Sequence, residues 1–241
     1  MNTNLLTLIR ILIPLSGLAY ASYKDWIERE VDDWIWIFSG AAGGSLTLVD
    51  LIYGWDINLG LTLLISMVLS IGLALAFYFL GFYGGADAKG IMVISLSLPI
   101  YYPPIKLHPF TGLASLSNGL LISLILLPAF FILNLIALAR GEKIFDGFEH
   151  ERTLRKIVAM FFGVRVKNAT RRKFWFPLET EREGKRFFDF KLLGLEFEEA
   201  KRDDCWMTPG LPLLISITIG FLFYVLVGDM LAVIIKLFTT T

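Results

Sequence analysis

The stretch LGLTLLISMVLSIGLALAFYFLGF, from Leu59 to Phe82, decides the fold, and it contains no charged side chain. About 20 apolar residues in a helix cross the roughly 30 Å hydrocarbon core of a bilayer, so this stretch predicts a membrane-spanning helix. The whole chain of 241 residues has the same character, because 56% of its residues are hydrophobic and only 18% are charged. This composition excludes a disordered chain and an ordinary soluble domain.

Five further apolar runs accompany this stretch, and we predict six membrane-spanning helices in all. The shortest run, Gly90–Tyr102, is long enough to cross the membrane only if flanking residues are included in the helix, with the Lys89 side chain extending to water. The first run, Leu5–Tyr23, ends in Ala19–Ala21 in the manner of a signal-peptide cleavage site. We expect it to be retained as a span, because Arg10 lies inside the apolar run rather than before it. The remaining runs are Trp34–Tyr53, Gly112–Ala139 and Leu211–Ile235.

A polar insert precedes the last run. Residues Arg140–Thr208 hold 16 of the 22 basic and 13 of the 22 acidic residues, so the positive-inside rule predicts a cytoplasmic insert and outer termini. Mixed patterns at Arg165–Lys167 and Phe187–Phe190 predict short strands, and Glu149–Val158 predicts a helix. We therefore expect an all-α polytopic membrane protein with a small mixed α/β cytoplasmic insert before the last helix. The expected domains are residues 1–139 with five spans, 140–208 with the insert, and 209–241 with the sixth span.

The sequence has few of the residues and motifs that common enzyme classes use for catalysis. The chain has two histidines, His108 and His150, and one cysteine, Cys205, so neither a zinc site nor an internal disulfide is expected. A nucleophilic pair of Cys205 and His150 is conceivable, but a buried structural cysteine is the favoured reading. We find no nucleotide-binding loop or serine-hydrolase motif, and we expect no metal and no other cofactor.

Carboxylates beside the predicted spans are the remaining candidates for chemistry. A charge in hydrocarbon costs at least about 2.5 kcal/mol, so such acids are usually paired or functional. The predicted topology puts Asp25, just after the first span, and Asp87, just before the fourth, at the same cytoplasmic face. Asp50 and Asp56 fall at the opposite face, and Asp229 lies toward the outer end of the last span. Asp25 and Asp87 can therefore meet across a helix bundle.

The sequence around Asp87 is unusually rich in glycine. Residues Gly81–Gly90 read GFYGGADAKG, and four glycines in this stretch allow the helix to break and to present Asp87 away from lipid. The alternative is a flexible turn in which Asp87 is simply an interfacial acid beside Lys89.

These residues resemble a known family. Gly84–Lys89 (GGADAK) resembles the G-x-G-D-x-K motif of membrane-embedded aspartic proteases that process type IV prepilins and archaeal preflagellins. Asp25–Asp33 resembles the first aspartate motif of that family, although Asp32 stands where many members have proline and Ala86 stands where the motif has glycine. The layout is closest to the archaeal preflagellin peptidases. The presenilin branch fits less well, because Pro128–Phe130 only approximates its third motif.

The resemblance implies an enzyme of an archaeal plasma membrane that removes a basic leader peptide at the cytoplasmic face. Asp25 and Asp87 would be its catalytic residues, with neither assigned as the base. The motif residues that would support them are Gly84, Gly85, Ala86 and Lys89. Its partners would be preflagellin or prepilin-like substrates and the lipid bilayer.

Two charged segments offer interaction surfaces. Residues Ser22–Asp33 carry more acids than bases, and we hypothesise that Glu28, Glu30, Asp32 and Asp33 attract the basic leader; a solvated polar turn is the alternative. The run Arg171–Phe176 in the insert is basic and then aromatic. Because the insert as a whole is nearly balanced in charge, we expect contact with anionic headgroups and no nucleic acid.

Two other functions compete with proteolysis. A small proton- or cation-coupled transporter would use the same carboxylates, but it predicts charges in mid-span and internal repeats, which this sequence lacks. A non-catalytic membrane scaffold would leave the motif at Gly84–Lys89 without a purpose.

Overall fold

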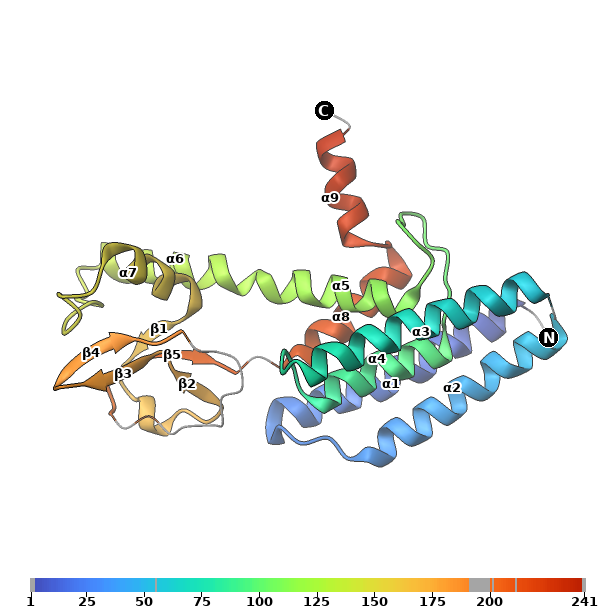
Figure 1. Cartoon of the computed structure of the whole chain (residues 1–241), viewed down its shortest axis with the longest axis horizontal. Coiled ribbons are helices and arrows are strands. Elements are labelled where there is room, and N and C mark those ends of the chain that lie inside the picture. The colour runs from blue at the N-terminus through green and yellow to red at the C-terminus, as the bar shows by residue number, and fades with distance from the viewer. Residues whose placement is uncertain (1–2, 55, 191–199, 201, 211, 240–241) are drawn as a thin grey trace. The chain divides into compact units, whose positions relative to one another are not determined.

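The computed structural model describes residues 3–54, 56–190, 200, 202–210 and 212–239. The chain forms two compact units, Met1–Ser123 with Pro212–Thr241 and Leu124–Leu211. Figure 1 labels the elements of both units along the chain.

The first unit is a helical bundle. Among the described residues, four helical stretches are long and apolar enough to cross a membrane. Leu5–Glu28, Asp33–Tyr53 and Ile57–Phe79 belong to this unit, whereas Thr111–Ala139 belongs to the second unit from Leu124 on. The protein is thus mostly helical with several candidate spans, as predicted. The helices of this unit are α1 (Thr3–Glu28), α2 (Asp33–Tyr53), α3 (Ile57–Phe79), α4 (Gly85–Ser97), α5 (Thr111–Leu124), α8 (Leu213–Leu226) and α9 (Met230–Thr239).

Helix α4 lies among the other helices of this unit and packs against α1, α2, α3 and α8 (Figure 1). It has only 13 residues, about 20 Å of helix, which is shorter than the hydrocarbon core. The contact with α2 is very close at Gly43, where a Cβ atom would lie 1.7 Å from Ser97 Oγ. Only glycine fits at this position of α2.

The last apolar run, Leu211–Ile235, forms two helices, and the sixth span stays a prediction. Helix α8 ends at Leu226 and α9 begins at Met230. Between them Gly228 has a φ of +132°, and a Cβ atom there would lie 1.7 Å from the carbonyl oxygen of Ile105. The backbone N–H of Asp229 donates to that same oxygen at 2.9 Å. Close approach of the loop before α5 therefore breaks the final run.

The second unit combines two helices with two small sheets. The strand predictions at residues 165–167 and 187–190 are confirmed by β1 and β4, and the predicted helix at 149–158 begins four residues late. The order of the larger sheet is β1-β5-β2, all antiparallel, and β3 pairs with β4. The elements are α6 (Leu126–Ala139), α7 (Thr153–Phe162), β1 (Val164–Val166), a 3₁₀ turn (Ala169–Arg171), β2 (Trp175–Pro177), β3 (Glu179–Arg182), β4 (Lys185–Phe188) and β5 (Cys205–Pro209).

The insert packs onto α6 through a buried amide. Asn134 of α6 is 2% exposed, and its Nδ2 donates to the carbonyls of Met160 at 3.0 Å and Gly163 at 2.7 Å. In the core of this unit, Phe148 stacks on Phe188 of β4 with ring centroids 4.3 Å apart. The compact unit therefore reaches into the apolar run as far as Leu124. The predicted division between membrane and water at residues 139 and 140 stays a prediction.

Candidate active site

Asp87 lies in the first turn of α4 and is 9% exposed. Its Oδ2 accepts a hydrogen bond from the backbone N–H of Gly84, the residue that caps the helix, at 3.1 Å. This contact satisfies one of the free N–H groups at the helix start, where a negative charge is also favoured. The sequence GGAD thus builds a helix start that holds the carboxyl in a buried position.

Asp25 lies in the last turn of α1 and is partly buried. Helix α1 packs against α4. Leu18 contacts the α4 backbone at Gly90, where an added Cβ atom would lie 3.0 Å from its Cδ2, and Arg10 donates to the carbonyl of Ser97 at the other end of α4. The two helices are therefore antiparallel, and Asp25 at the end of α1 and Asp87 at the start of α4 lie at the same end of this helix pair.

Arg29 is a third charged residue of this neighbourhood. It follows the end of α1 with a left-handed φ of 59°, and its backbone N–H donates to the carbonyl of Asp25 at 3.2 Å. Glycine usually takes this position at a helix end, so an arginine here is an uncommon choice. Arg29 therefore adds a positive charge one helical turn after Asp25. The sequence analysis gave Arg29 no role; its place one helical turn after Asp25 is the signal that could have found it.

Tyr83 anchors the turn that precedes Asp87. Its hydroxyl donates to the carbonyl of Ala74 in α3 at 2.9 Å, and its ring packs against Phe77. Burial, assisted by the negative charge of Asp87, raises the pKa of Tyr83 to about 12. The phenol is therefore neutral at physiological pH and ties this turn to α3.

The glycine-rich motif does break the helix, as expected, because α3 ends at Phe79 and α4 begins at Gly85. Only Gly81 in this turn needs a left-handed backbone, with a φ of +75°. A Cβ atom on Gly85 would meet the ring of Tyr78 at 3.6 Å, which is ordinary contact. Ala86 is partly buried against the bundle core, which explains why a methyl group is accommodated where the motif has glycine.

The predicted leader-binding acids differ in their surroundings. Glu28 is paired with Lys24 at 2.5 Å, and Asp33 is paired with Lys89 of the motif, also at 2.5 Å. Glu30 and Asp32 are both exposed. Neither forms an ion pair within the part of the chain that the structure describes. The acidic segment is thus partly neutralised by the protein's own bases, and Lys89 connects α4 to the start of α2.

The other candidate nucleophile and metal ligands do not form a site. Cys205 is buried in β5, and burial raises the pKa of its thiol to about 12, so it is a structural cysteine as expected. Within the described residues, no three histidine, cysteine or acidic side chains lie close enough together to hold a metal ion.

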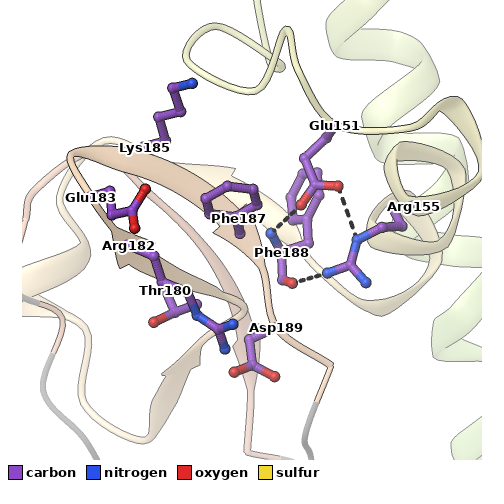
Figure 2. A pocket seen from close by; sticks show the side chains of 9 residues that line it. All are labelled: Glu151, Arg155, Thr180, Arg182, Glu183, Lys185, Phe187, Phe188 and Asp189. Atoms are coloured by element: carbon purple, nitrogen blue, oxygen red, sulfur yellow. Dashed lines mark hydrogen bonds and ion pairs between the residues drawn. The ribbon is translucent and has the colours of Figure 1, made fainter.

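The second unit has an open polar pocket of about 600 Å³ beside β3 and β4 (Figure 2). Glu151 accepts from the backbone N–H of Phe188 at 2.9 Å, and it pairs with Arg155 at 2.9 Å. Arg155 in turn donates to the carbonyl of Phe188. The backbone N–H of Phe188 is thus bonded by Glu151, just before α7, and its carbonyl by Arg155 of α7, so this cluster secures the end of β4 and resembles no catalytic arrangement.

Comparison with known proteins agrees with the motifs. A protein named preflagellin peptidase from Methanococcus maripaludis is 27% identical over 239 residues, which cover 92% of this chain and 96% of that protein. The preflagellin peptidase of Methanocaldococcus jannaschii is 24% identical over 234 residues, covering 92% of this chain and 95% of that protein. The chain is therefore similar, over almost its whole length, to two archaeal proteins named preflagellin peptidase.

The family described as "Archaeal Peptidase A24 C-terminus Type II" matches residues 155–230. This match begins in α7 and ends at the first residue of α9, so it includes neither Asp25 nor Asp87. The resemblance to preflagellin peptidases predicted from the motifs is confirmed by the relatives, which extend over almost the whole chain. The transporter reading gains no support from them.

Proposed function

We propose that the protein is a membrane-embedded aspartic endopeptidase that removes the basic leader from preflagellins or related type IV pilin-like preproteins. The observation that carries the proposal is that Asp25 ends α1 and buried Asp87 begins α4, at the same end of two helices that pack against each other. The relatives named preflagellin peptidase support the choice of substrate.

The chemistry needs only the two carboxyl groups and water. Two carboxyls held together share one proton, because ionising both is costly. The ionised member removes a proton from water, whose oxygen attacks the scissile carbonyl, while the protonated member donates to the carbonyl oxygen. The carboxyl that has gained a proton then donates it to the departing amide nitrogen as the C–N bond breaks. No covalent link to the enzyme forms.

The proposed topology has six spans in an archaeal plasma membrane, with the short α4 and the α8–α9 pair as the fourth and sixth. The aspartates and the insert of residues 140–208 face the cytoplasm, and both termini face outside. The excess of basic residues in the insert supports this orientation. The lipid bilayer surrounds the apolar side chains that the helices leave exposed, such as Leu61, Val68 and Phe79.

The leader binds the acidic segment after α1 in this proposal. Glu30 and Asp32 are the main contacts, because Glu28 and Asp33 already pair with Lys24 and Lys89. Attraction between exposed charges is screened by salt, so leader binding weakens as ionic strength rises.

The dyad is tested with purified enzyme and a preflagellin, with the new N-terminus mapped by mass spectrometry. Asp25→Asn and Asp87→Asn each abolish cleavage while the protein stays in the membrane fraction. Asp56→Asn is the matched control, since Asp56 caps α3 by accepting from Asn58 N–H at 3.0 Å and asparagine caps equally well. Near wild-type cleavage by either dyad variant would refute the assignment.

The leader contact is tested by reversing two charges. Glu30→Lys with Asp32→Lys raises KM for a basic leader and removes most of its salt dependence, whereas kcat changes little. Glu142→Lys, an exposed acid in the insert, is the control and leaves KM unchanged. An unchanged KM in the double variant would leave the solvated turn as the correct reading.

A further inference from the structure

Side chains from α1 and α2 meet at the C-terminal end of α4. Arg10 of α1 donates from Nε to the carbonyl of Ser97 at 2.8 Å. Thr47 of α2 donates from Oγ1 to the carbonyl of Leu96 at 2.7 Å, and it accepts from Arg10 Nη2 at 3.1 Å. Arg10 Nη1 also donates to Asp50 of α2 at 2.6 Å. The end of α4 is therefore held by a hydrogen-bonded cluster, which we call the α4 clamp: Arg10, Thr47 and Asp50.

The α4 clamp supplies donors where water does not reach. The last carbonyls of a helix have no partner within the helix. Ser97 is 0% exposed and Leu98 is 2% exposed, so unbonded carbonyls here would be buried and unsatisfied. Arg10 is itself 6% exposed, and Asp50 balances its charge. Arg10 of α1 therefore caps the C-terminal end of α4, a different helix.

The opposite end of α4 is held by different contacts. There the Asp87 carboxyl accepts from the nearby Gly84, Tyr83 ties the adjoining turn to α3, and the ion pair between Lys89 and Asp33 has side chains that are 42% and 72% exposed. Ion pairs between exposed side chains contribute little to the free energy of folding, so this pair does not fix the position of α4 by itself. Because a helix of 13 residues is stiff, a shift or rotation at Ser97 moves Asp87 with it.

We propose that the α4 clamp is a positioning site that fixes the height and rotation of α4 and thereby the placement of Asp87 relative to Asp25. This proposal rests on the proposed function for its effect on catalysis. Arg10 is a positioning residue, since it lies at the far end of α4 from Asp87 and touches no reacting atom. Misplacement of a catalytic group by about 1 Å can cost about 10²-fold in rate.

The register of α4 against α2 can be measured without any activity. A Cβ atom on Gly44 would lie 3.9 Å from Leu96 Cβ, which is close to the separation of about 3.8 Å found in disulfides. Gly44→Cys with Leu96→Cys, in a chain with Cys205→Ser, is therefore expected to crosslink readily in membranes. The crosslink yield reports whether α4 keeps its position.

Arg10→Met removes every donor of the guanidinium, and we expect it to cut the crosslink yield to less than half. In the chain without added cysteines, the same change lowers kcat by about 10²-fold with little change in KM. Thr47→Val keeps the side-chain shape, and it lowers the crosslink yield and kcat by less than Arg10→Met does. Arg10→Lys keeps the charge beside Asp50 and restores part of both. Asp56→Asn, a carboxylate of the next loop, is the control and alters neither.

Wild-type crosslinking in both Arg10→Met and Thr47→Val would overturn the proposal, and so would lost crosslinking with an unchanged kcat. A merely structural role would lower the amount of folded protein while the crosslink yield and kcat per folded molecule stay constant, which also overturns it. If the unmutated enzyme fails to cut a preflagellin, the proposed function is wrong, and the crosslink yield still decides whether Arg10 positions α4.

Discussion

The contact between Gly43 and Ser97 gives the sharpest test of the packing around α4. An added Cβ atom would lie 1.7 Å from Ser97 Oγ, 2.5 Å from Ser97 Cβ and 3.0 Å from Ser97 Cα, so Gly43→Ala forces the two helices apart. Atoms in contact sit about 3.5–4.0 Å apart, so a rotation of the serine side chain cannot relieve the backbone contact. Overpacking of this kind typically costs about 1–3 kcal/mol, and this site belongs at the upper end.

The same helix provides a matched control. A Cβ atom on Gly40 would meet Val93 and Leu96 at 3.7 and 3.8 Å, which is ordinary contact. Alanine is favoured over glycine within helices by up to about 1 kcal/mol, so Gly40→Ala is neutral or stabilising. With roughly 2–4 °C per kcal/mol for a chain of this size, Gly43→Ala lowers the apparent Tm by about 6–12 °C.

The assay is thermal unfolding in nanodiscs, followed by cleavage of a preflagellin at a temperature where both variants are folded. Adding Ser97→Gly to Gly43→Ala removes the clashing side chain and recovers part of the lost Tm. Activity falls with Gly43→Ala, because α4 carries Asp87. Equal Tm values for Gly43→Ala and Gly40→Ala would show that α2 and α4 do not meet as described.

Three further predictions follow from single residues. Arg29→Gln removes a positive charge one helical turn after Asp25, and a nearby positive charge favours the ionised form of a carboxyl. The acid limb of the pH dependence of kcat/KM therefore moves to higher pH, and Arg29→Lys returns it; identical profiles would remove Arg29 from the site. The hydrogen bond from Arg165 lowers the pKa of Asp204, so Asp204 contributes stability above its unfolded pKa and loses it as pH falls through the folded pKa. Unfolding between pH 5 and about 3 is therefore less pH-dependent in Asp204→Asn than in the wild type, and an equal dependence would contradict this. Asn134→Leu leaves two buried carbonyls unsatisfied and destabilises the protein by about 2–4 kcal/mol, measurable as a lower Tm; an unchanged Tm would count against that contact.

The sequence predicts those features that depend on local composition. Long runs without charge are enough to find α2 and α3, and the insert stands out by its charge. The position of Asp25 after one span and of Asp87 before another also predicts that they share a face, because parity along the chain fixes the side of each loop. The glycines predict a break before α4 for a similar reason, since they act through their own backbone.

The remaining features depend on partners distant in sequence. Helix α4 ends at Ser97, where Arg10 and Thr47 from other helices donate to its last carbonyls. The sequence of residues 90–102 does not predict that end. The break at Gly228 is set by the carbonyl of Ile105, which the apolar pattern of the last run does not encode. The sequence could have predicted the pairing of Arg10 with Asp50, because each is a charged residue within an apolar run and needs a partner of opposite charge there.

The hydrogen bonds of the Asn134 amide determine where a chimera between this protein and a related one can be joined. A chimera that exchanges the insert at Arg140 would pair a foreign α7 with this α6, and the carbonyls at positions 160 and 163 would face an amide that evolved for other neighbours. A junction at Leu124 carries α6 along with the insert and keeps donor and acceptors together. The insert and the apolar helix α6 therefore need to be exchanged together.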